Sequence, residues 1–278
     1  MIRAEWTKQW GRRRTLILVA AAVLFPVVMT VSLVGTGSGK VERVGDIPLV
    51  VVPARSGLSV PLISLSSTMR FFLPLLVAVV AGEAIAGEAA TGRLRYALAD
   101  PRSRGRYLLS KAGVAASICV ALLAVLFAVS VAAGVIAFGW HPLTPINGGQ
   151  SAASTVSTFS PASALAKLGV GVAYVSAGMA GVFSFGLLLS TLTTRPFVAV
   201  AGAVGLSVLS RVFNADYLPG VSAVSRYMPS NDIDLWQRLF ASPADTSGMG
   251  RFLLLQAGYF AVFSGAAWWL FTRRDVLT

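Results

Sequence analysis

The sequence predicts an all-α integral membrane protein with six transmembrane helices, folded as one domain over residues 1–278. Three observations support this prediction. Hydrophobic residues make up 55% of the chain, and charged residues make up only 12%, whereas a soluble domain carries about 25% charged residues. The apolar residues also gather in long runs, and a bilayer core about 30 Å thick needs roughly 20 such residues per helix.

Six runs qualify as spans, and no repeat or linker divides the chain. The first run follows a basic start, as a secretory signal does, but it continues past Pro26 to Val34 without a small-residue cleavage pattern. We therefore interpret it as a retained span. The six predicted spans are 15–34, 71–87, 112–138, 164–192, 197–213 and 252–272.

Basic residues orient these spans, because lysine and arginine concentrate in cytoplasmic connections. With the N-terminus inside, fourteen of the 23 basic residues lie on the cytoplasmic side. The segment between the second and third spans, 88–111, contributes the densest group of them. The charge pattern therefore predicts that both termini are cytoplasmic.

Three connections are then extracytoplasmic: 35–70, 139–163 and 214–251. The first contains a strand-like apolar run, Ile47–Val52, and the second is rich in Ser, Thr and Gly. The third is too aromatic for a solvated loop of its length. We interpret it as short re-entrant or interfacial helices, which membrane depth tolerates only when they are buried against protein or a wet cavity.

The chain begins with an amphipathic pattern over residues 1–14. Ile2, Trp6 and Trp10 recur every four residues, and basic residues occupy much of the remainder. This spacing predicts a helix in the inner membrane interface with its tryptophans at headgroup depth. The alternative is a basic flank that only orients the first span.

Two carboxylates, Glu83 and Glu88, lie near the inner end of the second span. A charged side chain in hydrocarbon costs roughly 2.5–3.5 kcal/mol on insertion scales, so each should face water, a basic partner or the bundle interior. Glu88 marks the membrane exit. Glu83 lies about 7.5 Å deeper, and we interpret it as half of a buried structural ion pair, with a place on a substrate pathway as the alternative.

After Glu88 the pattern becomes amphipathic. Leu94 and Leu98 are interspersed with arginines, and Pro101 separates this stretch from a second basic one. Because proline ends one helix and permits the next, we predict two short helices along the inner membrane surface with their basic residues exposed. The alternative is a solvated loop that only sets topology.

Other motifs indicate no chemistry. Residues 35–40 read GTGSGK, but the first glycine and the final Ser or Thr of a phosphate-binding loop are missing. His141 has no second histidine at ligand spacing, and Cys119 has no disulfide partner. We therefore expect no catalytic residue, no bound metal and no cofactor in this chain. The basic residues flank spans, which argues against nucleic-acid binding.

The segment 88–111 resembles the cytosolic signature of the ABC-2 type transporter permeases, the membrane subunits of ATP-driven exporters. That signature runs Glu, three residues, Gly-Thr-Leu, a short gap, Pro-x-Ser-Arg, and a Lys that opens the next span. Arg93 stands where Thr is usual, and Thr91 lies on the other side of the glycine. The matching residues are Glu88, Gly92, Leu94, Pro101, Ser103, Arg104 and Lys111.

The basic amphipathic start, the first span with its proline and the aromatic segment before the last span are also similar to this family. The resemblance implies a bacterial cell membrane protein, paired with a second permease copy or a related permease. It implies docking on two cytosolic ATPase subunits, which would hold ATP and Mg, with Trp6 and Trp10 as a second contact. The implied ATPase-coupling residues are Thr91, Arg93, Leu94, Arg95, Leu98, Pro101, Arg102, Arg104 and Arg106.

By this resemblance the protein exports a substrate such as a hydrophobic drug, an antibiotic or a lipid. One alternative is a non-transporting membrane scaffold or sensor that regulates a partner through the same surface. A membrane-embedded enzyme and a secondary transporter are the others. The last usually needs internal repeats and ionisable residues within the membrane, and the sequence shows neither a repeat nor a charge cluster at mid-membrane depth.

Overall fold

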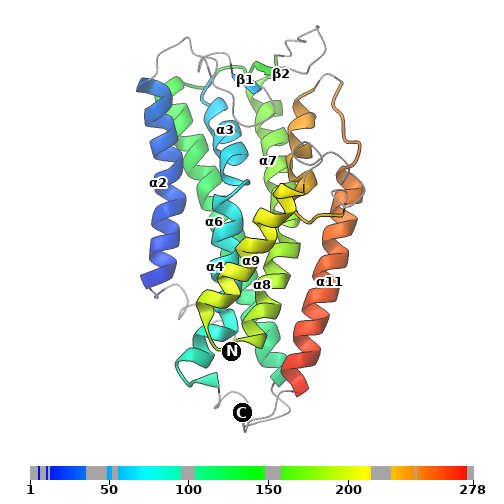
Figure 1. The fold of residues 1–278 in the computed structure, drawn as a ribbon. Coiled ribbons are helices and arrows are strands. Elements are labelled where there is room, and N and C mark those ends of the chain that lie inside the picture. The colour runs from blue at the N-terminus through cyan, green and yellow to red at the C-terminus, as the bar shows by residue number, and fades with distance from the viewer. Residues whose placement is uncertain are drawn as a thin grey trace.

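The computed structural model of this chain is a bundle of long helices (Figure 1). It describes residues 6, 11, 13–35, 49–51, 56–94, 104–147, 158–213, 227–241 and 243–273. These ranges contain eight α-helices, one 3₁₀ helix and two short strands. The elements are α2 (Arg13–Gly35), β1 (Leu49–Val51), α3 (Ser59–Thr68), α4 (Phe72–Ala90), α6 (Arg104–Phe138), β2 (Pro145–Asn147), α7 (Pro161–Gly178), α8 (Ala180–Leu192), α9 (Pro196–Val212), η2 (Asn231–Phe240) and α11 (Met249–Arg273).

Within the described ranges, five helical stretches are long and apolar enough to cross a membrane. They are α2, α4, α6, α11 and the stretch Pro161–Leu192, in which α8 follows α7 directly. The all-α expectation is confirmed, and these helices indicate a multi-pass membrane protein. The remaining expected span, 197–213, falls on α9, whose 17 residues extend only about 25 Å, less than a hydrocarbon core of about 30 Å.

Helix α3 differs most from the expectation, which placed it in a connection between spans. Nine of its 10 residues are buried, and α2, α4, α6 and α7 all contact it. The hydroxyl groups of Ser59, Ser66 and Thr68 donate to carbonyls three or four residues earlier, for example Thr68 Oγ1 to Ser64 O at 2.6 Å. Such bonds within the helix allow a hydroxyl-rich segment to be buried. Those same residues lower its hydropathy, which is why the sequence did not predict a core helix here.

Helices α3 and α4 together form one broken column through the bundle (Figure 1). Just before α3, the backbone of Gly57 contacts α6 so closely that a Cβ added to Gly134 would lie 2.1 Å from the Gly57 carbonyl oxygen. The Gly57 amide also donates to the Gly139 carbonyl at 2.9 Å. At the other end the column reaches Glu88, beside the start of α6. The column is therefore fixed to α6 at both ends.

The two strands lie at the upper end of the bundle in Figure 1. β1 pairs antiparallel with β2, and Val50 lies opposite Ile146. The predicted strand within Ile47–Val52 is thus confirmed over three residues. Because β1 precedes α3 and β2 follows α6, the pairing places these two connections at the same end of the bundle.

The aromatic segment before the last span contains the short helix η2, as the sequence predicts, and residues 214–226 of that segment lie outside the described ranges. Trp236 and Phe240 of η2 are fully buried. Two side chains of α7 donate to its backbone: Tyr174 Oη to Asp232 O at 2.8 Å, and Lys167 Nζ to Leu239 O at 2.6 Å. η2 is therefore packed against α7 and is not a solvated turn.

Candidate functional site

The candidate site is the basic segment that joins α4 to α6, at the lower end of the bundle in Figure 1. The structure describes its beginning, as far as Leu94, and its continuation from Arg104. Thr91, Arg93 and Arg106 are exposed, Arg104 is half-buried and Leu94 is buried. The other residues implied as contacts lie outside the described ranges: Arg95, Leu98, Pro101, Arg102 and Trp10.

Helix α4 ends in a hydrogen-bonded cap built on Gly92. This glycine has φ +70°, a left-handed conformation that side chains rarely adopt. The Gly92 amide donates to Ala89 O, and the Arg93 amide donates to Glu88 O, both at 3.0 Å. These two bonds form a Schellman motif. Thr91 Oγ1 also donates to Glu88 O, at 3.1 Å, so the hydroxyl beside the glycine helps to end the helix.

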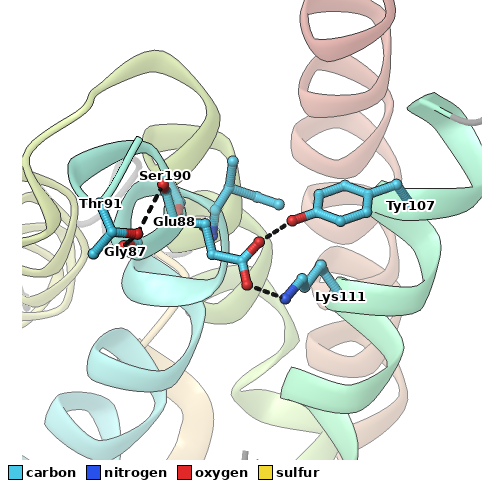
Figure 2. A network of polar contacts seen from close by, with 7 residues as sticks. Gly87, Glu88, Thr91, Tyr107, Lys111 and Ser190 are labelled. Atoms are coloured by element: carbon cyan, nitrogen blue, oxygen red, sulfur yellow. Dashed lines mark hydrogen bonds and ion pairs between the residues drawn. The ribbon is translucent and has the colours of Figure 1, made fainter. Parts of the chain in front are cut away.

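The carboxylate of Glu88 crosses from α4 to α6, where Tyr107 and Lys111 both bind it (Figure 2). Lys111 Nζ lies 2.5 Å from Glu88 Oε1, and Tyr107 Oη donates to Glu88 Oε2. Glu88 is 5% exposed and Lys111 is 3% exposed. Because an unpaired charge at such a position is strongly destabilising, this clamp, Glu88–Tyr107–Lys111, holds the two ends of the basic segment together.

A hydroxyl of α8 supports α4 one turn before the clamp (Figure 2). Ser190 Oγ accepts from the backbone amides of Ile85, at 3.0 Å, and Ala86, at 2.9 Å. These amides lie inside α4, where they would ordinarily donate to carbonyls of the same helix. A side chain inserted into the helical ladder in this way is a recognised cause of local bending. Ser190 therefore couples α8 directly to the backbone beneath the clamp.

The end of α11 completes this end of the bundle. Arg104 Nη1 donates to Thr272 O at 3.5 Å, and the rings of Tyr107 and Phe271 stack with centroids 6.2 Å apart. Tyr107 thus contacts the clamp with its hydroxyl and α11 with its ring. The first turn of α6 is a junction between α4 and α11.

Glu83 pairs with a basic residue of α2. Arg14 Nη1 donates to Glu83 Oε2, and the two side chains are 30% and 26% exposed. Trp6, a described residue of the expected N-terminal helix, is partly buried against α2 and α6. The apolar cluster that it contacts consists of Ala22, Val114, Ile118, Leu122 and Leu126.

The sequence singled out Glu83, Glu88 and Lys111, but it did not pair Glu88 with Lys111 or indicate that Tyr107 binds Glu88. Tyr107 and Lys111 stand four residues apart on α6, a spacing that places both on one helix face, and this was the available signal. Nothing in the sequence indicates Ser190, because a serine within an apolar helix usually bonds to its own backbone. In the described ranges, no group of three or more His, Cys, Asp or Glu side chains could hold a metal ion.

The fold and this site define an all-α protein with several apolar helices of membrane-spanning length and a clamped basic segment between two of them. The chain belongs to the family described as "Protein of unknown function (DUF2705)", whose model matches residues 48–277. The match includes the clamp, the basic segment and η2. No curated protein matches the chain.

Proposed function

We propose that this protein is the membrane subunit of an ATP-driven exporter of the ABC-2 type. The observation that supports the proposal best is the construction of the segment 88–111. Glu88, Gly92 and Lys111, three residues on which the resemblance rests, cap α4 and pair it with α6. They leave a basic segment held at both ends, which is what a surface that receives force from a partner requires.

In the proposed mechanism the clamp makes α4 and α6 move as a unit when a partner pushes on the segment between them. Ser190 carries that movement to α8, and the pair of Arg14 with Glu83 carries it to α2. Tyr107 and Arg104 carry it to α11. Displacement at one surface thus reaches three neighbouring helices through polar contacts and one stacked ring pair, as transitions between two packed arrangements require.

The proposal includes a bacterial cell membrane location with both termini in the cytoplasm and six crossings, one of which uses α9. Two cytosolic ATPase subunits would bind the basic segment and hold ATP and Mg. A second copy of the chain, or a related permease, would complete the pathway across the bilayer. No nucleotide site is proposed in this chain itself.

A reconstituted complex tests the proposal. The neighbouring reading frame should encode a soluble ATPase with a complete phosphate-binding loop, and the pair in sealed vesicles should move substrate only with ATP. Leu98→Asp and Arg93→Glu should abolish assembly or uncouple ATP hydrolysis from transport. Arg195→Glu is the matched control, because Arg195 is an exposed basic residue before α9, outside the segment.

Normal transport by both segment variants would contradict the assignment of the coupling surface. Assembly with the ATPase without any ATP-dependent movement of substrate would favour a scaffold or sensor that uses the same surface.

A further inference from the structure

The break between α3 and α4, residues 69–71, lies well inside the bundle. Arg70 is roughly 27 Å from Glu88 and roughly 20 Å from Gly57 along the column, at about 1.5 Å per residue. A hydrocarbon core about 30 Å thick that begins at Glu88 therefore extends just past Arg70, so the break lies near one edge of the core. The sequence predicts Arg70 at the edge of an outer connection, and α3 buries the chain before it within the bundle.

Two arginines meet at this break. Arg211, near the end of α9, donates from Nη2 to the carbonyl of Met69 at 3.2 Å, and that carbonyl belongs to the peptide bond that leads to Arg70. Arg70 Nε is buried without a hydrogen-bond partner. Among the described residues, no ion pair engages Arg70. A guanidinium at membrane depth is expensive and usually marks a functional site.

The start of α4 adds to the positive potential. No side chain caps this helix at its N-cap residue, Phe71, so the first amides of α4 carry the partial positive charge of a helix N-terminus. Arg70 immediately precedes it. Arg70, the guanidinium of Arg211 and an uncapped helix start therefore all lie at this break, and each favours an anion.

One side of the break is closed and the other faces outward. On the closed side, η2 covers it, since Trp236 Nε1 donates to Met69 Sδ at 3.2 Å and Met69 is fully buried. On the other side, Phe71 is 58% exposed and Leu209 of α9 is 50% exposed. In a bilayer these apolar side chains contact lipid, so an entering ligand needs an apolar body as well as an anionic end.

We propose that this break binds the oxyanion headgroup, phosphate or carboxylate, of an amphiphile that enters from the bilayer past the exposed side chains of Phe71 and Leu209. Arg70 supplies a planar fork of donors suited to an oxyanion, and Arg211 and the amides of α4 supply further positive charge. The alkyl chain lies along the exposed apolar residues. That this amphiphile is the exported substrate rests on the proposed function, whereas its binding does not.

The test measures binding by the full chain alone in neutral maltoside micelles. Dodecyl phosphate should raise the thermal unfolding midpoint in a saturable way, because a ligand that binds only the folded state stabilises it. Dodecyltrimethylammonium and inorganic phosphate should not. Arg70→Gln should weaken the apparent affinity for dodecyl phosphate at least tenfold. Arg195→Gln, which removes the same charge from the other end of α9, should leave that affinity unchanged.

Equal affinity in Arg70→Gln and the unaltered chain would overturn the proposal, as would equal stabilisation by the cationic amphiphile. Stabilisation by inorganic phosphate as strong as that by dodecyl phosphate would indicate a soluble oxyanion and overturn entry from the bilayer. If Arg70→Gln does not fold, Arg70→Lys is the variant to measure, because it keeps the positive charge but removes the planar guanidinium. Wild-type affinity for dodecyl phosphate in Arg70→Lys would overturn the proposal. Binding without any transport by the ATPase complex would disprove the export function and leave this site intact.

Discussion

Glu88 acts through its side chain and its backbone at once. The carboxylate binds Tyr107 and Lys111 on α6, and the carbonyl accepts the Arg93 amide in the cap of α4. The first role depends on the side chain, and the second needs only a residue in helical conformation followed by Gly92. The two roles are therefore separable by substitution.

Substitutions of Glu88 should remove the role of its side chain and keep the role of its backbone. Glu88→Ala leaves Lys111 buried without its carboxylate, and we expect a loss of about 3–5 kcal/mol in the free energy of unfolding, measured by denaturant unfolding in detergent. Glu88→Leu combined with Lys111→Met, which leaves no buried charge, should recover most of that loss. Tyr107→Phe is the control that removes the hydroxyl donating to Glu88 and leaves the ion pair with Lys111 in place. Wild-type stability of Glu88→Ala would show that the clamp does not stabilise the fold.

At the scale of elements, the residues just before α3 cross α6 in direct backbone contact. Gly57 and Gly134 meet without room for a Cβ on either. Small residues at such crossings let helices approach closely in membranes, where van der Waals packing drives helix association. The close crossing also brings the start of α3 beside the end of α6.

Two alanine substitutions on α6 separate close approach from helix propensity. Gly134→Ala places a Cβ 2.1 Å from the Gly57 carbonyl oxygen and should destabilise by about 1–3 kcal/mol, as overpacking does. Gly113→Ala, with nothing within 4 Å of the added Cβ, should stabilise by about 0.5–1 kcal/mol. Thermal unfolding of both variants measures this. Equal unfolding midpoints for the two variants would mean that the contact between Gly57 and Gly134 accommodates an added methyl group without loss of stability.

Helix η2 carries a carboxylate, Asp232, whose pKa is raised above 3.8 by desolvation, with Arg251 and Arg238 opposing the shift. The ionised form is thus disfavoured in the folded state, so this group's contribution to stability is fully present below its unfolded pKa and is lost as the pH rises through the folded value. Asp232→Asn should therefore raise the unfolding midpoint at pH 7 but not near pH 3.5.

Asp245 provides a control of opposite sign. Hydrogen bonds from Ser247 are the main cause that lowers the pKa of this exposed carboxyl. Its contribution is present above the unfolded pKa and is lost as the pH falls through the folded one. Asp245→Asn should lower the midpoint at pH 7 or leave it unchanged. A gain at pH 7 from Asp245→Asn as large as that from Asp232→Asn would indicate a general charge effect.

For the whole molecule, the charge pattern and the bundle make a joint prediction about sidedness. Thr91 lies at the clamp end of the bundle, whereas Thr158, next to the bridge between Leu143 and Phe159, lies at the strand end, and both threonines are exposed. In a Cys119→Ala background, Thr91→Cys should react with an impermeant maleimide only from the cytoplasmic side. Thr158→Cys should react only from the outside. Labelling of both from one side would contradict a bundle that crosses the membrane.

The sequence alone determined the all-α class, the positions of five apolar helices and the strand at 49–51, because continuous apolar runs and short β-branched stretches fix these locally. It also marked Glu88 and Gly92. Only the tertiary structure decided that α3 is buried, that Glu88 binds Lys111 and that Arg211 reaches the break at Arg70. These depend on which distant segments pack together, and hydropathy cannot distinguish a helix face that meets lipid from one that meets another helix.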